Sequence, residues 1–151
     1  MKAGNNNASG LIPPLGKMLA EDDRVVAAYL FGSFARGSLR PDSDIDLALV
    51  YRDDEARSAV ETDLLTMLGR LAVAAGRDVH VVDLERAGHV LRFQVFQGGA
   101  ELFNKQPEKT KRLLEHTVIE RFDWEYAMKV MDRAYAAQTL NGAGSGQGTD
   151  G

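Results

Sequence analysis

Residues 32–50 read GSFARGSLRPDSDIDLALV, and this stretch decides the expected fold. It follows VVAAYLF at residues 25–31, a β-branched and aromatic run typical of a buried strand that ends where Gly32 starts a turn. Its last part continues into DIDLALVY at residues 44–51, which predicts a second strand. The sequence therefore indicates two neighbouring strands joined by a turn and a polar loop.

The turn after the first strand has the composition of a phosphate-binding site. Gly32 lets a phosphate or another backbone come close, and N–H groups at the start of a following helical turn attract anions. The Ser33 hydroxyl adds a hydrogen-bond donor, and Arg36 and Arg40 are near enough in sequence to supply positive charge. We expect these four residues to bind a nucleotide, although each arginine also fits an ordinary surface position.

Two aspartates open the second strand. Because side chains alternate between the faces of a strand, we expect Asp44 and Asp46 to point one way and Ile45 and Leu47 the other. Paired carboxylates suit Mg2+, which orients a triphosphate and offsets charge on the leaving pyrophosphate. An isolated Asp-x-Asp also fits a solvated strand start. Its place after Gly-Ser and a polar loop favours a metal-binding, catalytic pair for nucleotidyl transfer.

The rest of the chain alternates predicted helices and strands. Helical spacing over residues 55–75 ends at Gly76, and the apolar run at residues 78–84 predicts a third strand. We also expect helices at 15–19, 90–96 and 107–140, and a short strand at 100–103. This order predicts an α+β fold, with a small mixed β-sheet flanked by helices and a long C-terminal helix.

The length of 151 residues suits one domain with one core. We expect residues 1–10 to be disordered and residues 11–140 to form the domain. Within the domain, residues 25–103 form the expected core and residues 107–140 a C-terminal helical part. The glycine-rich residues 141–151 are expected to be a flexible tail.

The long helix carries an apolar stripe at every fourth position, which we expect to pack mostly on the domain. The stripe consists of Leu114, Val118, Phe122, Tyr126 and Val130. A second set of large side chains extends the apolar surface, and a minority of them is expected at a partner interface. This set consists of Trp124, Met128, Met131 and Tyr135.

Composition excludes several classes of protein. A net charge of -4 argues against extended nucleic-acid binding, which needs a basic surface. The chain has no cysteine, so disulfides and thiolate metal sites are excluded. We find no apolar run of the kind that a signal peptide or a membrane span needs, and we expect a soluble, cytoplasmic protein without a membrane partner.

The stretch GSFARGSLRPDSDIDLALV resembles the signature of the minimal nucleotidyltransferase family, within the DNA-polymerase-β-like nucleotidyltransferase superfamily. The resemblance runs from Val25 to Phe103. It implies the nucleotidyltransferase fold, Mg2+ and ATP as substrate. By position, Gly32 and Ser33 would hold the ATP phosphates, and the two aspartates would bind Mg2+. Many family members that resemble this chain are antitoxins, which transfer AMP to a tyrosine of a HEPN ribonuclease toxin and silence it.

The chain departs from the family at one position. Relatives place a third acidic residue on the next central strand, but here that position holds His80. Asp78, two residues earlier on the same expected face, is an alternative third metal ligand. Histidine can act as a general base but binds Mg2+ less well than a carboxylate. His80 is therefore a catalytic base, a sign of weakened catalysis, or a core histidine.

Three functions stay open at this point. The first is an adenylyltransferase antitoxin that forms a hetero-oligomer with a HEPN toxin. The second is an antitoxin that has lost transfer through His80 and neutralises its partner by binding. The third is a nucleotidyltransferase that modifies a small molecule such as an antibiotic, although such enzymes normally carry an added domain that shapes an acceptor pocket.

Overall fold

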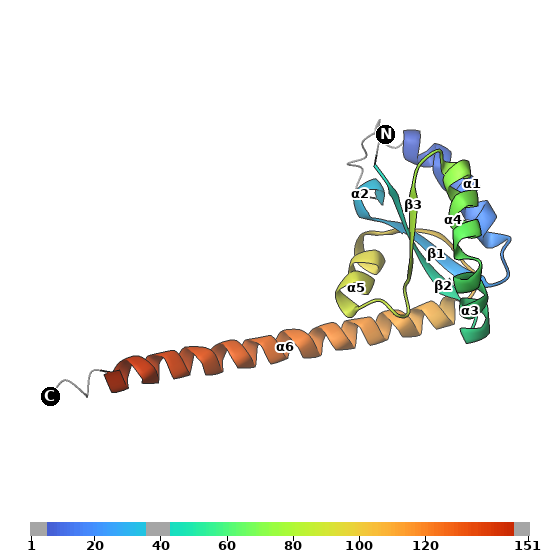
Figure 1. Cartoon of the computed structure of the whole chain (residues 1–151). Helices are drawn as coiled ribbons and strands as arrows, with labels where there is room; N and C mark the ends of the chain where they lie inside the picture. The colour runs from blue at the N-terminus through green and yellow to red at the C-terminus, as the bar shows by residue number, and fades with distance from the viewer. Residues whose placement is uncertain (1–5, 36–42, 147–151) are drawn as a thin grey trace.

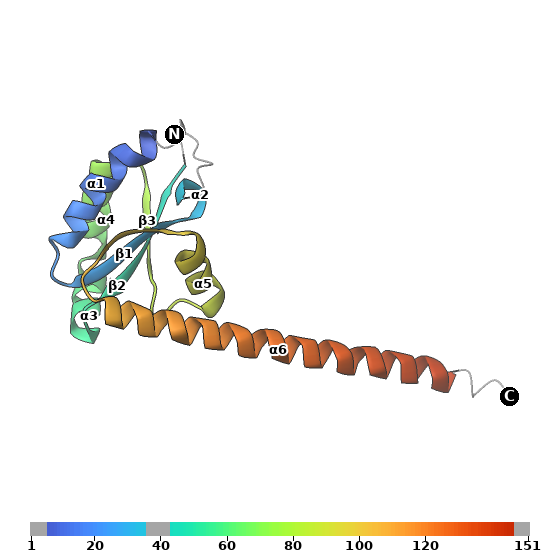
Figure 2. The ribbon, with the colours of Figure 1, turned by 180° about the vertical axis from the view of Figure 1, so that it is seen from behind.

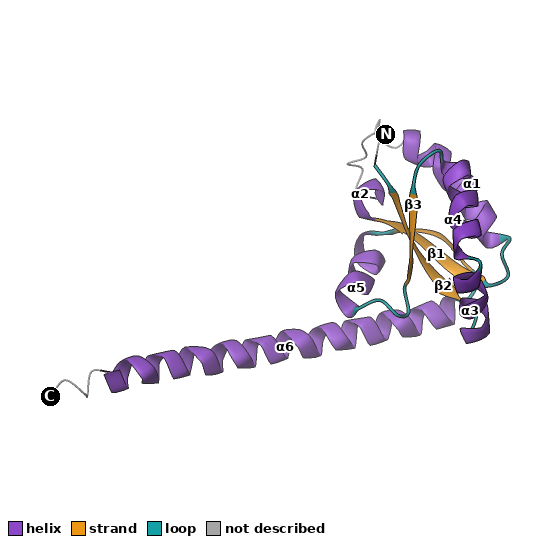
Figure 3. Cartoon of the chain, viewed as in Figure 1, coloured by secondary structure: helices purple, strands orange, loops and turns teal. Residues whose placement is uncertain are grey.

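The protein is built on a four-stranded mixed sheet with helices on both faces. The computed structural model describes the backbone of residues 6–35 and 43–146, and the side chains of residues 10, 13–33 and 43–137. The strands β1 (Val25–Phe31), β2 (Ile45–Tyr51), β3 (Val79–Asp83) and β4 (Ala100–Asn104) lie in the order β3-β2-β1-β4. β3 pairs parallel with β2, whereas both neighbours of β1 are antiparallel to it. The α+β architecture predicted from the sequence is confirmed (Figure 3).

In the described part of the chain, six helices accompany the sheet. They are α1 (Asn6–Ala20), α2 (Gly32–Ala35), α3 (Asp54–Thr62), α4 (Leu64–Ala75), α5 (His89–Gly98) and α6 (Pro107–Gly146). The helices α1 and α4 lie together on one face of the sheet, and α5 with the start of α6 covers the other (Figure 1 and Figure 2). Over the described part of the chain, none of these helices combines the length and the apolar character needed to cross a bilayer.

The two central strands are apolar on both faces because both faces are covered. Ile45, Leu47 and Leu49 of β2 are fully buried in the cluster under α1 and α4. Ala48 and Val50 point to the opposite face, where they pack in the cluster that contains Val95 of α5. The alternation therefore assigns Asp44 and Asp46, which share the parity of Ala48 and Val50, to the face that carries α5.

The single helix expected at residues 55–75 is two helices, and Gly76 ends the second one as predicted. Asp63 separates them, with its N–H donating to the carbonyls of Ala59 and Val60. Its carboxylate lies 3.5 Å from Arg24, which precedes β1. A short polar side chain with a partner outside the helix favours an interruption at this position. Gly76 adopts the left-handed conformation (φ 66°) that closes a helix.

Both terminal helices are longer than expected. α1 begins at Asn6, so it replaces the predicted helix at 15–19 and includes residues 6–10, which were expected to be disordered. α6 continues to Gly146, into the segment expected to be a flexible tail. Once part of a helix is docked, further turns need no new nucleus, which explains both extensions. Residues 1–5 and 147–151 lie outside the described part.

The apolar stripe expected to pack α6 on the domain is largely exposed. Phe122 and Tyr126 are 69% and 64% exposed, and Leu114, Val118 and Val130 are also exposed. A spacing of four residues advances about 40° around a helix at each step, so this stripe winds away from the domain. The domain-facing side instead includes the buried Thr110 and Thr117. Beyond α5, the helix projects away from the sheet (Figure 1).

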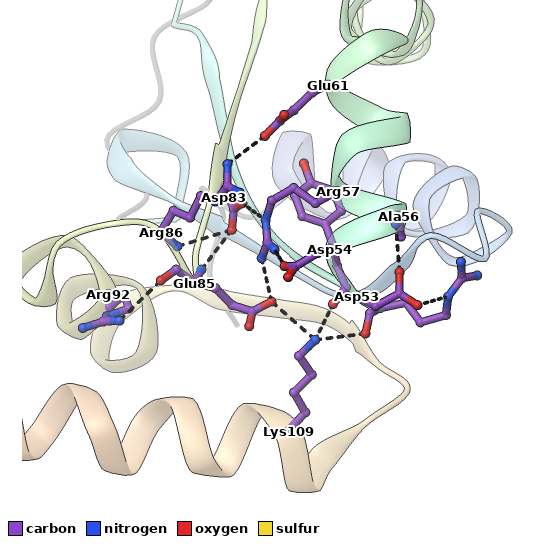
Figure 4. Close-up of polar contacts among 12 residues, drawn as sticks. Asp53, Asp54, Ala56, Arg57, Glu61, Asp83, Glu85, Arg86, Arg92 and Lys109 are labelled. Carbon is purple, nitrogen blue, oxygen red and sulfur yellow. Dashed lines mark hydrogen bonds and ion pairs between the residues drawn. The ribbon is translucent and has the colours of Figure 1, made fainter.

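A buried arginine ties α3, the end of β3 and the start of α6 together (Figure 4). Arg57 donates to Asp83 at 2.5 Å and to Glu85 at 3.1 Å. Glu85 lies 3.4 Å from Lys109 Nζ, which also donates to the carbonyl oxygen of Tyr51 at 2.6 Å. The network fixes the base of α6 at the end of the sheet opposite the two aspartates.

Candidate active site

The end of β1 lies against the carboxylate of Asp46 in β2. Phe31 pairs with Asp46 in the antiparallel register, and the chain turns at Gly32 with a φ of 75°, a conformation that L side chains rarely adopt. A Cβ built on Gly32 would lie 2.5 Å from Asp46 Oδ2. Only glycine therefore lets the turn into α2 approach the carboxylate this closely.

The two aspartates lie at the start of β2. Asp46 is partly buried beneath the turn, and the Asp44 side chain is 48% exposed. Their neighbours Ile45 and Leu47 are fully buried on the other face, as strand alternation predicts. The structure thus brings Gly32, Asp44 and Asp46 to one edge of the sheet, beside the first turn of α2.

His80 belongs to the same edge because β3 runs parallel to β2 and pairs His80 with Asp46. Its Nε2 lies 2.9 Å from Asp44 Oδ2, and its side chain is 61% exposed. The hydrogen bond to Asp44 raises the pKa of His80, and the charges of Asp44, Asp46 and Asp78 add to this effect. The interpretation of His80 as a core histidine is wrong, since the ring is exposed and bound to a site carboxylate.

Asp78 lies just before β3 and is exposed. Its carbonyl oxygen accepts a hydrogen bond from the N–H of Ile45, which joins the starts of the two parallel strands. Within residues 6–35 and 43–146, the structure contains no group of three or more His, Asp or Glu side chains placed to hold a metal ion. Asp78 therefore does not complete a three-residue cluster with Asp44 and Asp46.

The residues present still fit a hard cation. Asp44 and Asp46 supply anionic oxygen ligands, which Mg2+ prefers, and the absence of a Cβ at Gly32 keeps space beside Asp46 Oδ2. Ser33 follows Gly32 in α2 and is partly buried. Arg36 and Arg40, the two expected cationic residues, lie outside the described residues.

Sequence reasoning missed one feature of this edge. A cavity of about 330 Å³ opens beside Gly32 and is lined by Phe31, Gln94, Gln97 and Gly98. The sequence predicts a helix near residues 90–96, but nothing in it indicates that the end of this helix meets the end of β1. No local signal in the sequence distinguishes these glutamines from surface residues.

Comparison with known proteins identifies the family of the chain. Residues 15–108 match the family model described as Polymerase beta, Nucleotidyltransferase. The chain belongs to this nucleotidyltransferase family. The match includes all four strands and every described residue of the candidate site. The family match therefore supports nucleotidyltransferase activity for this chain.

This chain is similar to a named adenylyltransferase and to a solved chain from a toxin–antitoxin. The chain is 34% identical over 99 residues to protein adenylyltransferase MntA of Shewanella oneidensis strain MR-1. The aligned stretch covers 62% of this chain and 68% of that protein. A crystal structure of a toxin–antitoxin with AMP-PNP is 25% identical, with a TM-score of 0.60, covering 87% of this chain and 98% of the other.

A second solved structure supports the fold alone. It contains a tri-AMPylated Shewanella oneidensis HEPN toxin in complex with its MNT antitoxin, and it matches at 23% identity with a TM-score of 0.58. The match covers 85% of this chain and 98% of the other. The nucleotidyltransferase fold expected from the resemblance is thus confirmed.

Proposed function

We propose that the chain is a Mg2+-dependent adenylyltransferase antitoxin, which transfers AMP from ATP to a tyrosine of a HEPN ribonuclease toxin and so neutralises it. The observation that carries the proposal is the close packing of Gly32 on Asp46 with Asp44 beside it. This arrangement combines a backbone cradle with a paired-carboxylate site. The 34% identity to an adenylyltransferase supports the choice of AMP as the transferred group.

Asp44 and Asp46 would hold the Mg2+ ion, without Asp78 as a third ligand. When bound, Mg2+ orients the triphosphate and offsets the charge of the leaving pyrophosphate. Gly32 and Ser33 would bind the phosphates through the start of α2, and Arg36 and Arg40 would add positive charge. The protein would act in the cytoplasm, where ATP and a ribonuclease toxin are both present.

His80 gives the second candidate function its support. At pH values below its raised pKa the imidazole is protonated and cannot accept a proton from an attacking hydroxyl. It also occupies one oxygen of Asp44. A catalytic base role requires Asp44 to release His80 when a cation binds. If Asp44 does not, the chain neutralises its partner by contact alone.

The outer face of α6 is the surface that we assign to the toxin. We define it as Ile119, Phe122, Tyr126 and Val130, which repeat at spacings of three and four residues and are all exposed. Such a stripe fits an apolar groove of a partner, where aromatic side chains act as anchors. One similar solved chain comes from a toxin–antitoxin with AMP-PNP, and another comes from a complex with a HEPN toxin, which supports a HEPN toxin as the occupant.

The test is mass spectrometry of the cognate HEPN toxin after incubation with this protein, Mg2+ and ATP. We expect a tyrosine-containing toxin peptide to gain the mass of one or more AMP groups. Asp44→Asn together with Asp46→Asn should remove this gain, whereas Asp23→Asn, an exposed aspartate before β1, should keep it. A stable complex without any mass gain would favour the contact antitoxin. AMP on a small acceptor without toxin would contradict both.

A further inference from the structure

The cavity beside Gly32 lies next to the candidate active site, and its lining differs from the paired carboxylates of that site. It is bounded on one side by Phe31 and Gly32, at the end of β1, and on the other by Gln94, Gln97 and Gly98 of α5. Asp46 pairs with Phe31 and points to the same face of the sheet that α5 covers. A ligand whose phosphates lie at Gly32 can therefore extend into this cavity.

The end of α5 is held firmly against β1. Val95 is fully buried against the sheet, and Phe96 packs edge-on against Tyr29 at 5.6 Å between ring centroids. A Cβ at Gly99 would lie 2.5 Å from the carbonyl oxygen of Val95 and 3.0 Å from that of Leu30. Because only glycine fits there, the helix end approaches β1 closely, and the cavity wall is preorganised.

The lining selects a class of ligand. Among the residues that the structure describes, its side chains are two neutral amides and one aromatic ring, none of them charged. Neither amide has a hydrogen-bond partner among the described residues. Each can therefore donate one hydrogen bond to a ligand and accept another from it. A volume of about 330 Å³ is at the small end of ligand sites. These properties suit a neutral, planar base and not a phosphate.

We propose that this cavity binds the base of the nucleoside triphosphate, and that Gln94 and Gln97 select adenine over guanine. An amide can donate to N7 of adenine and accept from its N6 amino group, whereas guanine presents acceptors at both N7 and O6. Phe31 supplies an apolar wall for the ring. The inference rests on the proposed use of ATP and adds the residues that recognise its base.

The test measures binding of three probes to the full chain by isothermal titration calorimetry with Mg2+: ATP, GTP and tripolyphosphate, which has no base. We expect the wild type to prefer ATP. Gln94→Leu and Gln97→Leu should each weaken ATP binding by about tenfold, the size of a lost amide–adenine pair, and reduce the preference over GTP. Binding of tripolyphosphate should not change, because the phosphates lie at Gly32.

Gln106→Leu is the matched control, since Gln106 is an exposed glutamine before α6, outside the cavity lining, and should leave all three affinities unchanged. Equal losses of ATP and tripolyphosphate affinity in the cavity variants would overturn the inference, as would an unchanged ATP-to-GTP ratio or a wild type that binds neither nucleotide. Failure of the proposed function gives a different result: the protein binds ATP in preference to GTP, but it transfers no AMP to the toxin.

Discussion

His80 Nε2 lies 2.9 Å from Asp44 Oδ2, across the parallel strands β2 and β3. This contact links the residue that departs from the family pattern to one of the two proposed metal ligands. Protonated imidazole is favoured by the hydrogen bond to Asp44, so the pKa of His80 is raised. The stabilisation from this pair is complete below the unfolded-state pKa of about 6.5. It is lost as the pH rises through the raised folded-state pKa.

The first prediction concerns this titration. NMR of the His80 ring across pH should show a pKa above its ordinary value, and Asp44→Asn should lower it because the charge and the strong acceptor are both removed. Asp54→Asn, at the opposite end of the sheet, should leave the titration unchanged. A His80 pKa that does not respond to Asp44→Asn would show that the pair does not form in solution.

The second prediction adds Mg2+ to the same titration. If Asp44 binds the cation, it withdraws an oxygen from His80 and places positive charge beside the ring, so the pKa of His80 should fall. NaCl at matched ionic strength is the control for screening. An identical His80 titration with Mg2+ and with NaCl would argue against Asp44 as a ligand.

Two glycines give the third prediction. Gly32→Ala places a Cβ 2.5 Å from Asp46 Oδ2 in a left-handed conformation, so it should abolish AMP transfer and also reduce stability. Gly69→Ala, on the exposed side of α4 with no atom within 4 Å of its added Cβ, should raise stability by up to about 1 kcal/mol. Activity assays and urea unfolding of both variants check this pair. Full activity in Gly32→Ala would contradict the tight cradle.

The sequence predicts the central part of the fold because its signals there are local. The apolar run of β1, the alternation around Ile45 and the C-cap at Gly76 each depend on a few neighbouring residues, and all three are confirmed. The close approach of Gly32 to Asp46 is a long-range feature, and the sequence predicts only that a phosphate or another backbone can come close to Gly32. Family resemblance supplied the role of the position that His80 occupies.

Other features depend on contacts that the sequence does not display. The break at Asp63 reflects its partner Arg24, far away in the chain. The exposure of His80 follows from the register of β3 against β2. The cavity at Gln94 exists because Gly99 lets α5 approach Leu30. In each case, tertiary packing decides between alternatives that local patterns leave open.

The fourth prediction tests the network at the base of α6. Arg57 is 5% exposed and pairs with Asp83 and Glu85. Arg57→Ala leaves Asp83 without its cation and Glu85 with Lys109 alone, so the free energy of unfolding should fall by about 2–3 kcal/mol, below the full value for a completely buried pair. Arg86→Ala, which removes an exposed pair with Glu61, should cost less than about 0.5 kcal/mol. Urea unfolding compares the two, and equal losses would contradict the ranking.

The fifth prediction separates docking of the toxin from nucleotide binding. Phe122→Ser with Tyr126→Ser removes two anchors from the outer face of α6 without touching the sheet, so the complex with the HEPN toxin should be lost while ATP still binds. The matched control is Leu65→Ser with Val73→Ser, since these α4 residues are large apolar side chains that are 86% and 85% exposed. Size-exclusion chromatography with the toxin and calorimetry with ATP provide the two measurements. Loss of the complex in the α4 variant alone would move the docking surface to the opposite face of the sheet. Loss in both variants would show that the toxin contacts both helices, because neither pair of side chains supports the core.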